Sequence, residues 1–183
     1  MYTELKNFLF EEAHRTHTQL YAIVDSAVDG MIDGHFESDE PKKQILYRDE
    51  EDRRTLELKA PHLIVLEKEH PFTERLFKEG YGNHWGCFLF SKENLPTLAD
   101  HLSNYTKVYS TEHQQDVYVR FYDPRAMGQY FPLFDKEESK AFFTYIEAIA
   151  VEDAKNPKVL YTYSLHKQSE QIQREEKDLE AMV

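Results

Sequence analysis

The spacing of apolar side chains predicts that helices and strands follow one another along the chain. Leu5, Phe8 and Leu9 recur at helical spacing, which predicts an amphipathic helix over residues 4–18. The next segment, LYAIVD, is a short apolar run typical of a buried strand. The chain is therefore expected to begin with a helix that leads directly into a strand.

The middle of the chain predicts a sheet covered by helices. The Asp-Gly pairs at 29–30 and 33–34 predict a polar loop that runs to residue 43. HWGCFLFS is apolar on both faces, as expected of an internal strand between two layers of helices. Strands are predicted at QILYR, APHLIVLE and HWGCFLFS, and helices at PFTERLFKEGYG and at SKENLPTLADHLSNYTKV, the second capped by Ser91.

The last third of the chain predicts a hairpin and then a helical region. KVYS and DVYVRFYD flank a polar turn, and helices are predicted over 124–134 and 136–154, with Asp135 as the second cap. KVLYTYSL is predicted as an edge strand. From His166 onward the chain is highly charged and has only a thin apolar stripe, which predicts a weak, exposed helix.

These elements predict an α/β fold, a small mixed sheet covered by helices and followed by a C-terminal helical region. At 183 residues and 40% hydrophobic content, the chain can bury one sizeable core. The predicted organisation is an N-terminal helix (1–17), an α/β domain (18–146) and a C-terminal extension with a charged helix (147–183).

The charge balance argues against a nucleic-acid partner. There are 22 Lys and Arg against 34 Asp and Glu, a net charge of −12, and no basic block interrupts the acidic background. The N-terminus lacks the pattern of a secretory signal, and no apolar window approaches the roughly 18 residues of a membrane span. Because the single cysteine, Cys87, cannot form an internal disulfide, we expect a reducing, cytoplasmic location.

Cys87 and His84 are the candidate catalytic pair, because a thiolate nucleophile needs a nearby imidazole. On a strand, however, residues three apart point to opposite faces, and the apolar neighbours of Cys87 favour a buried structural thiol. A small cysteine hydrolase or transferase remains the alternative function. His14 and His17 could share a helix face in a zinc site, but no third ligand is evident. No catalytic residue, metal site or cofactor is therefore predicted.

The segment VRFYDPR predicts a rigid joint between a strand and a helix. Pro124 suits the first helical position and leaves Asp123 as the N-cap. Arg120 and Arg125 need acceptors if they are buried, and Asp123 and Asp25 are the candidates. Since the segment supplies neither a nucleophile nor a poised base, it is interpreted as structural.

Four landmarks in order give the chain a resemblance to a known family. They are YAIVD (21–25), APHLIVLE (60–67), GYGNHWGCFLFS (80–91) and VRFYDPRAMGQYFPLFD (119–135). Over residues 18–146 the chain resembles the adaptor chaperones of bacterial type VI secretion effectors, which implies a compact α/β lobe. The marked positions of the family are occupied here by Trp85, Gly86, Arg120, Tyr122, Asp123, Pro124 and Arg125.

The resemblance implies a binding protein rather than an enzyme. Similar proteins hold a toxic effector in the cytoplasm and help to load it onto VgrG, the spike-tip protein. The C-terminal helices are predicted to offer the effector a groove or clamp, although they could equally pack on their own core. The predicted effector-binding residues are Phe142, Phe143, Tyr145, Ile146, Ile172 and Leu179.

Overall fold

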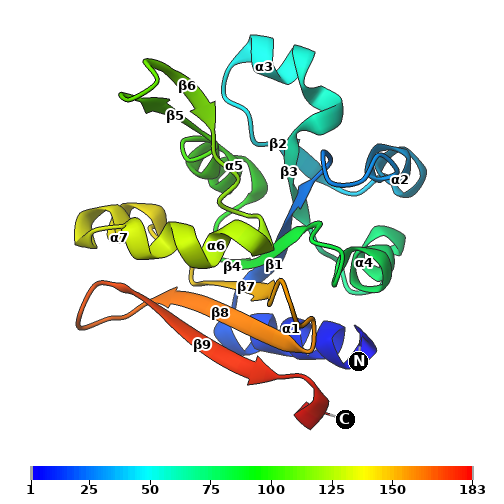
Figure 1. The fold of residues 1–183 in the computed structure, drawn as a ribbon. Coiled ribbons are helices and arrows are strands. Elements are labelled where there is room, and N and C mark those ends of the chain that lie inside the picture. Colours follow the sequence, from blue (N-terminus) through cyan, green and yellow to red (C-terminus); the bar gives the residue numbers. More distant parts are fainter. Residues whose placement is uncertain (1, 183) are drawn as a thin grey trace.

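Strand alternation divides the apolar side chains between two faces of one antiparallel sheet. The structure, a computed structural model, describes residues 2–182. Figure 1 shows the large sheet running through the molecule and the β5–β6 hairpin, a separate two-stranded sheet, projecting from the body of the protein. In chain order the elements are α1 Tyr2–Thr16, β1 Gln19–Asp25, α2 Ile32–Asp39, β2 Lys43–Ile45, α3 Glu50–Thr55, η1 Glu57–Lys59, β3 Pro61–Val65, α4 Pro71–Arg75, η2 Leu76–Gly80, β4 Gly86–Ser91, α5 Leu95–Ser103, β5 Lys107–Ser110, β6 Gln115–Tyr118, α6 Pro124–Tyr130, η3 Phe131–Leu133, α7 Lys136–Phe142, β7 Ala148–Glu152, β8 Val159–Leu165, β9 Ile172–Asp178 and η4 Glu180–Met182.

The large sheet contains strands from both ends of the chain. Its seven strands run in the order β2-β3-β1-β4-β7-β8-β9, and each neighbouring pair is antiparallel. Tyr21 at the centre of β1 lies opposite Val65 of β3 and Leu89 of β4. The C-terminal strands therefore extend the central sheet on the β4 side.

Helices cover both faces of this sheet. On β1, Leu20, Ala22 and Val24 join one apolar cluster with α1, α2 and α4, whereas Tyr21 and Ile23 join a second cluster with α5, α6 and α7. The α/β class and the layer of helices on a sheet are thus confirmed. The predicted small mixed sheet is wrong, because the sheet has seven strands that are all antiparallel to their neighbours, and apolar periodicity does not specify strand direction. No helix within residues 2–182 has the length and apolar character needed to cross a membrane.

Most of the predicted elements before residue 135 are present. The N-terminal helix, the strands at LYAIVD, QILYR, APHLIVLE and HWGCFLFS, and the helix that starts at Pro71 are confirmed. The helix α5 is also confirmed, but Asn94 rather than Ser91 caps it, since the Asn94 side chain accepts the Thr97 N–H at 3.1 Å. Ser91 instead donates to the Tyr145 carbonyl at 2.6 Å.

The polar loop predicted up to residue 43 is wrong in part, because it contains helix α2. Ile32 and Phe36 are four residues apart and lie on the same helical face, where both are buried against the sheet. The helix ends at Glu40, which adopts a left-handed conformation and donates its N–H to the Phe36 carbonyl at 3.1 Å. Burial of two apolar side chains outweighs the turn signal of the Asp-Gly pairs.

The helix predicted over 136–154 is wrong in its second half. Helix α7 ends at Phe142, and the apolar run from Ala148 to Glu152 forms β7 between β4 and β8. Its cap is confirmed: Asp135 and Glu138 form a reciprocal capping box. A short apolar run cannot be assigned to a helix or a strand by periodicity alone, which explains the error.

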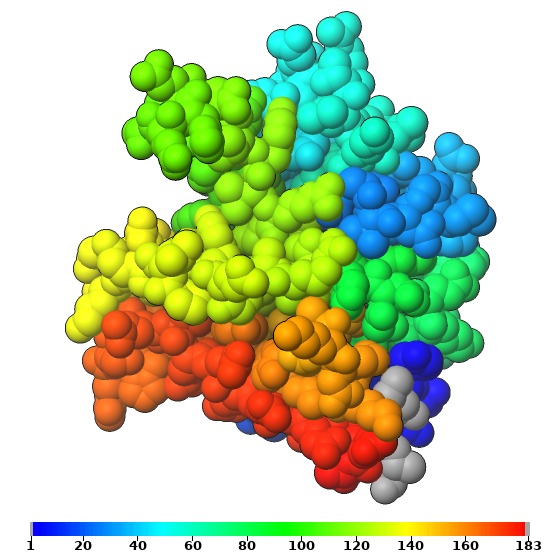
Figure 2. All heavy atoms as spheres, in the orientation of Figure 1, coloured from blue at the N-terminus to red at the C-terminus, as the bar shows by residue number. Residues whose placement is uncertain are grey.

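The predicted C-terminal helical region, including its charged helix, is wrong. Residues Ile172–Asp178 form β9, which pairs with β8 along its whole length, so β8 is not the edge strand. Leu179 then lies in the core with only 2% exposure. Figure 2 shows α6 and α7 directly against β8 and β9 on the molecular surface. The end of the chain is therefore a layer of strands beneath these helices.

Candidate functional site

The family landmarks meet at one end of the sheet. Because neighbouring strands are antiparallel, the end of β1 at Asp25 lies beside the starts of β3 and β4. The Asp25 N–H donates to the Trp85 carbonyl at 2.8 Å, and the Ser26 N–H donates to the Ala60 carbonyl at 3.4 Å. Backbone hydrogen bonds alone thus hold together the first three landmarks, at 21–25, 60–67 and 80–91.

Gly86 permits the close approach of β4 to β1 at this end. Its φ is +156°, and a Cβ there would lie 1.8 Å from the Ile23 carbonyl oxygen. The neighbouring Trp85 is buried, and a Cβ on Gly80 would lie only 2.8 Å from its Cε3. The Trp-Gly pair is therefore a packing requirement of the strand junction.

The fourth landmark forms the predicted joint, although the strand before it is shorter than expected. Strand β6 ends at Tyr118, and the adjacent Phe121 and Tyr122 are both buried, so the strand predicted over DVYVRFYD is wrong beyond Tyr118. The helix cap is confirmed, since Asp123 Oδ1 accepts the Arg125 N–H at 2.9 Å and Pro124 takes the first helical position.

Both arginines find the predicted acceptors. Arg125 donates to the two Asp123 carboxylate oxygens at 2.8 and 2.7 Å. Arg120 Nη1 lies 3.3 Å from Asp25 Oδ2, an ion pair whose geometry falls short of a hydrogen bond. The two arginine side chains remain 46% and 50% exposed, whereas both carboxylates are buried. We name Asp25, Arg120, Tyr122, Asp123, Pro124 and Arg125 the joint.

The two carboxyl groups of the joint have pKa values shifted in opposite directions. Burial raises the pKa of Asp25, although the bond from the Ala27 N–H and the charge of Arg120 act the other way. At Asp123, burial also acts to raise the pKa, but the bonds from Arg125 outweigh it and the pKa is lowered. Burial and the charge of Asp25 raise the pKa of Tyr47 to about 12. The charged groups of the joint are thus largely committed to one another.

The structure does not pair Cys87 with His84. Cys87 is 1% exposed within the apolar cluster, and burial raises the pKa of its thiol. The His84 Nδ1 lies 2.7 Å from a carboxylate oxygen of Glu152, which also accepts the Gly82 and His84 N–H groups. Among residues 2–182, no hydrogen bond links His84 to Cys87.

Glu152 is a buried charged residue that no pattern in the sequence singles out. It ties the loop before β4 to β7, and burial raises the pKa of its carboxyl although three donors act in the opposite direction. Residue 152 was predicted to lie on a helix, whereas it ends strand β7 beside the loop that contains Gly82. Within residues 2–182, no group of three His, Cys, Asp or Glu side chains is arranged to hold a metal ion.

Most of the predicted effector-binding side chains lie in the core. Figure 1 shows α7 and β9, the elements in or next to which these residues lie. The exposed fraction is 5% or less at Phe142, Phe143, Ile146 and Leu179. Tyr145 is 38% exposed and Ile172 is half-buried. The Phe142 ring packs against other rings, among them those of Tyr105, Phe121 and Phe131. Phe143, Tyr145 and Ile146 nevertheless help to line a hollow of about 310 Å³ on the surface, and the role of the six residues in binding stays a prediction.

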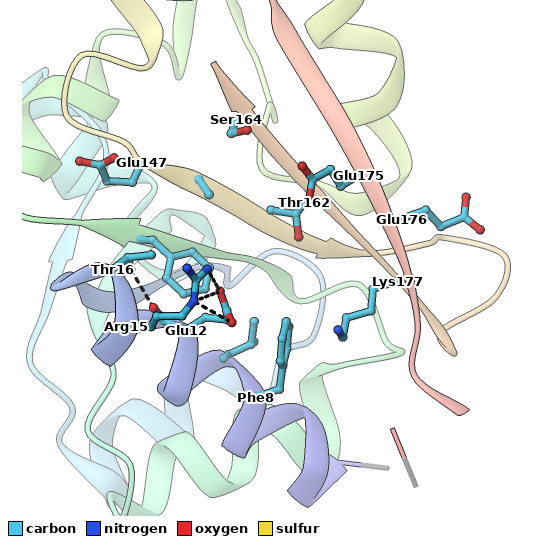
Figure 3. A pocket seen from close by; sticks show the side chains of 13 residues that line it. Phe8, Glu12, Arg15, Thr16, Glu147, Thr162, Ser164, Glu175, Glu176 and Lys177 are labelled. Atoms are coloured by element: carbon cyan, nitrogen blue, oxygen red, sulfur yellow. Dashed lines mark hydrogen bonds and ion pairs between the residues drawn. The ribbon is translucent and has the colours of Figure 1, made fainter. Parts of the chain in front are cut away.

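A cleft opens elsewhere, between α1 and the strands β7–β9, and we name it the terminal cleft. It has a volume of about 480 Å³. Figure 3 shows side chains of α1 on one side of an open space and those of β8 and β9 on the other. Its lining is Phe8, Leu9, Glu12, Arg15, Thr16, Phe90, Glu147, Ala148, Thr162, Ser164, Glu175, Glu176 and Lys177. This cleft was not predicted from the sequence, because residues 172–178 were expected to form a helix and not the strand β9.

Comparison with known proteins identifies the domain but no named relative. No curated protein and no solved structure matches the chain. Residues 20–141, from β1 to α7, match the family described as "Domain of unknown function (DUF4123)". All four landmarks lie within this match. The chain therefore belongs to the DUF4123 family.

Proposed function

We propose that the protein is a cytoplasmic adaptor chaperone that binds a type VI secretion effector and helps to load it onto the VgrG spike tip. The observation that carries this proposal is the set of four landmarks, which resemble those of the effector adaptors and converge on the joint. Membership of the DUF4123 family over residues 20–141 supports it. The proposed partners are a secreted toxin and VgrG.

The chemistry of the joint supports a binding role. Asp123 is occupied by its cap and by Arg125, and Asp25 faces Arg120. A general base needs a free carboxylate or imidazole within reach of a substrate proton. We infer that the joint holds the lobe rigid while another surface binds the effector.

The alternative function, a cysteine hydrolase or transferase, requires Cys87 to reach a substrate as a thiolate. Burial disfavours both the access and the ionisation of this thiol. We therefore rank this function below the adaptor role and do not propose a cofactor or a metal for either.

The adaptor proposal is tested by secretion from the native host. Effectors released by a strain that lacks this gene should be compared with those of the wild type and of a strain carrying Cys87→Ala. We expect one effector to be lost on deletion and kept in the Cys87→Ala strain. Unchanged secretion of every effector on deletion would overturn the proposal, and loss of the effector in the Cys87→Ala strain would favour the enzyme.

Co-purification adds a physical test. An affinity-tagged copy purified from the same host should carry the affected effector, with or without VgrG, in near-stoichiometric amount. If the tagged protein elutes alone from cells that express the secretion system, the adaptor proposal fails.

A further inference from the structure

The terminal cleft exists because β8 presents short side chains on one face. Thr162 and Ser164 line the cleft and are half-buried. Tyr163, which lies between them, points to the opposite face and packs on the Phe131 ring at 5.1 Å. One face of β8 is thus filled by aromatic packing, and the other leaves space beside α1.

The floor of the cleft is apolar. Leu9 and Phe90 belong to the core cluster on this side, and Phe8 and Ala148 pack against it while remaining partly exposed. A space of about 480 Å³ lies within the range of ligand-binding clefts and can receive several side chains of a partner. Aliphatic side chains suit this floor because they would remove its apolar surface from water.

The rim of the cleft is acidic. Four carboxylates line it, against the two cations of Arg15 and Lys177. Both cations are already engaged, since Arg15 donates to Glu12 at 2.5 Å and Lys177 Nζ lies 4.4 Å from the centre of the Phe8 ring. Two of the carboxylates are engaged as well, Glu12 with Arg15 and Glu147 with Lys92 at 3.0 Å. Glu175 and Glu176 form no ion pair with any residue in the range 2–182. The cleft therefore favours a cationic partner, as does the net charge of −12.

The cleft is built almost entirely outside the family match. Its lining comes from α1 and from residues 147–177, and Phe90 alone falls within residues 20–141. The region shared with the family thus provides the frame, while the two ends of this particular chain provide the walls. A surface outside the shared region is free to differ between family members, which is what recognition of different cargoes requires.

We propose that the terminal cleft is the cargo-docking site, and that it takes a segment with lysine or arginine side chains beside aliphatic ones. The aliphatic side chains sit on the floor between Phe8 and Ala148, and a cation reaches Glu175. This inference rests on the proposed adaptor function for the identity of the cargo. Its chemistry can be tested without that cargo.

The first test uses a short, fluorescently labelled helical peptide of leucine and lysine, with a leucine–glutamate peptide as its counterpart. The full-length protein should bind the lysine peptide, and binding should weaken as salt is added. Glu175→Lys should weaken it by about tenfold or more, because an attractive pair becomes a repulsive one. Equal binding of the glutamate peptide would overturn the inference.

Two matched controls separate the cleft from the general charge of the protein. Glu112→Lys changes the net charge by the same amount as Glu175→Lys, but at the exposed turn of the β5–β6 hairpin. Thr162→Trp fills the cleft, and Thr111→Trp adds the same ring to the hairpin turn. We expect both control variants to bind within about twofold of the wild type and Thr162→Trp to lose binding. If each control matches its cleft variant, the peptide does not use the cleft and the inference fails.

The last test uses the effector identified by co-purification. Thr162→Trp should lose this effector while Thr111→Trp keeps it, with both variants melting at the wild-type temperature. If the wild type captures the effector and Thr162→Trp keeps it fully, the docking inference fails while the adaptor function stands. If the wild type captures no effector, the proposed function fails, and the peptide measurements still decide the chemistry of the cleft.

Discussion

The frame, defined as residues 20–141, and the two ends, α1 and β7–β9, each contain a charged cluster, and the two clusters differ. In the frame the charges of the joint are directed at one another, as in the Asp123–Arg125 pair. At the ends, Glu175 and Glu176 line the terminal cleft and form no ion pair among the described residues, although other charges there are paired, as in Lys158–Glu180. The difference teaches that the joint uses charge to fix its own geometry, while the rim of the cleft leaves charge available to a partner.

The ends are nevertheless part of the same sheet. β7 lies between β4 and β8, and Glu152 of β7 accepts hydrogen bonds from the loop before β4. Leu179 and Leu160 complete the apolar cluster beneath α1. The comparison therefore concerns recognition, and stability is expected to depend on both regions.

The largest effect on stability is expected at Gly86 in the frame. Gly86→Ala would place a Cβ against the Ile23 carbonyl, so the free energy of unfolding should fall by about 4 kcal/mol or more. Gly34→Ala is the control, because a Cβ there meets nothing within 4 Å and α2 should gain up to about 1 kcal/mol. Urea unfolding measures both, and equal stabilities would contradict the assignment of Gly86 as the junction residue.

The next largest effect tests whether the ends support the frame. Leu179→Ala should lower the free energy of unfolding by about 3 kcal/mol, because it removes a buried side chain from the core. Leu133→Ala removes the same atoms from a side chain that is 76% exposed, and should have little effect. If the two variants have the same melting temperature, the ends are an appendage and the continuous sheet does not unfold as a single cooperative unit.

A smaller effect, with a pH dependence, is expected in the joint. Asp123→Ala should cost about 1–2 kcal/mol at neutral pH through the lost cap and ion pair. Because the folded pKa of Asp123 is lowered, its contribution is present above the ordinary value of 3.8 and is lost as the pH falls through the folded pKa. The difference in melting temperature between the wild type and Asp123→Ala should therefore shrink as the pH is lowered.

Asp25→Asn provides the opposite sign within the same joint. The folded pKa of Asp25 is raised, so the wild type binds a proton more tightly when folded and loses stability as the pH rises above 3.8. The variant should lack this decline.

An Asp123→Ala protein that keeps its melting temperature but loses the effector would make the joint a contact site instead of a structural one.

The smallest effect is expected at the outer strand. The Arg174 guanidinium carbon lies 4.4 Å from the centre of the Tyr161 ring, and Arg174 is exposed. Arg174→Ala should cost no more than about 1 kcal/mol, the usual range of an exposed cation–π contact. A loss larger than that of Asp123→Ala, measured in the same urea titration, would show that this contact stabilises the fold more than the cap and ion pair of the joint.

The sequence predicted the frame better than the ends, for a physical reason. β1 and β4 are apolar runs bounded by clear signals, and the Asp-Pro pair at 123–124 fixes a cap by local geometry. In contrast, Leu165, Ile172 and Leu179 recur every seven residues, a spacing that suits a helix. An edge strand needs few apolar side chains, so the charged β9 gave no strand pattern.

The candidate site shows the same division. The partners of Arg120 and Arg125 could be inferred because each lies near a recognisable strand or helix end. The terminal cleft could not be inferred, because it forms where α1 meets β9, and more than 150 residues of chain separate these two elements. Burial of Phe142 and Phe143 likewise depends on the ring of Phe131 in η3 and on the ring of Phe121, which precedes α6.

The origin of the terminal cleft also sets when it can act during the life of the protein. The wall formed by residues 8–16 is synthesised before the wall formed by residues 162–177. During translation the ribosome still holds the second wall when the β1–β4 pairing can already form. The cleft is therefore absent until residues 162–177 have left the ribosome, and a nascent chain can bind nothing through it before that point.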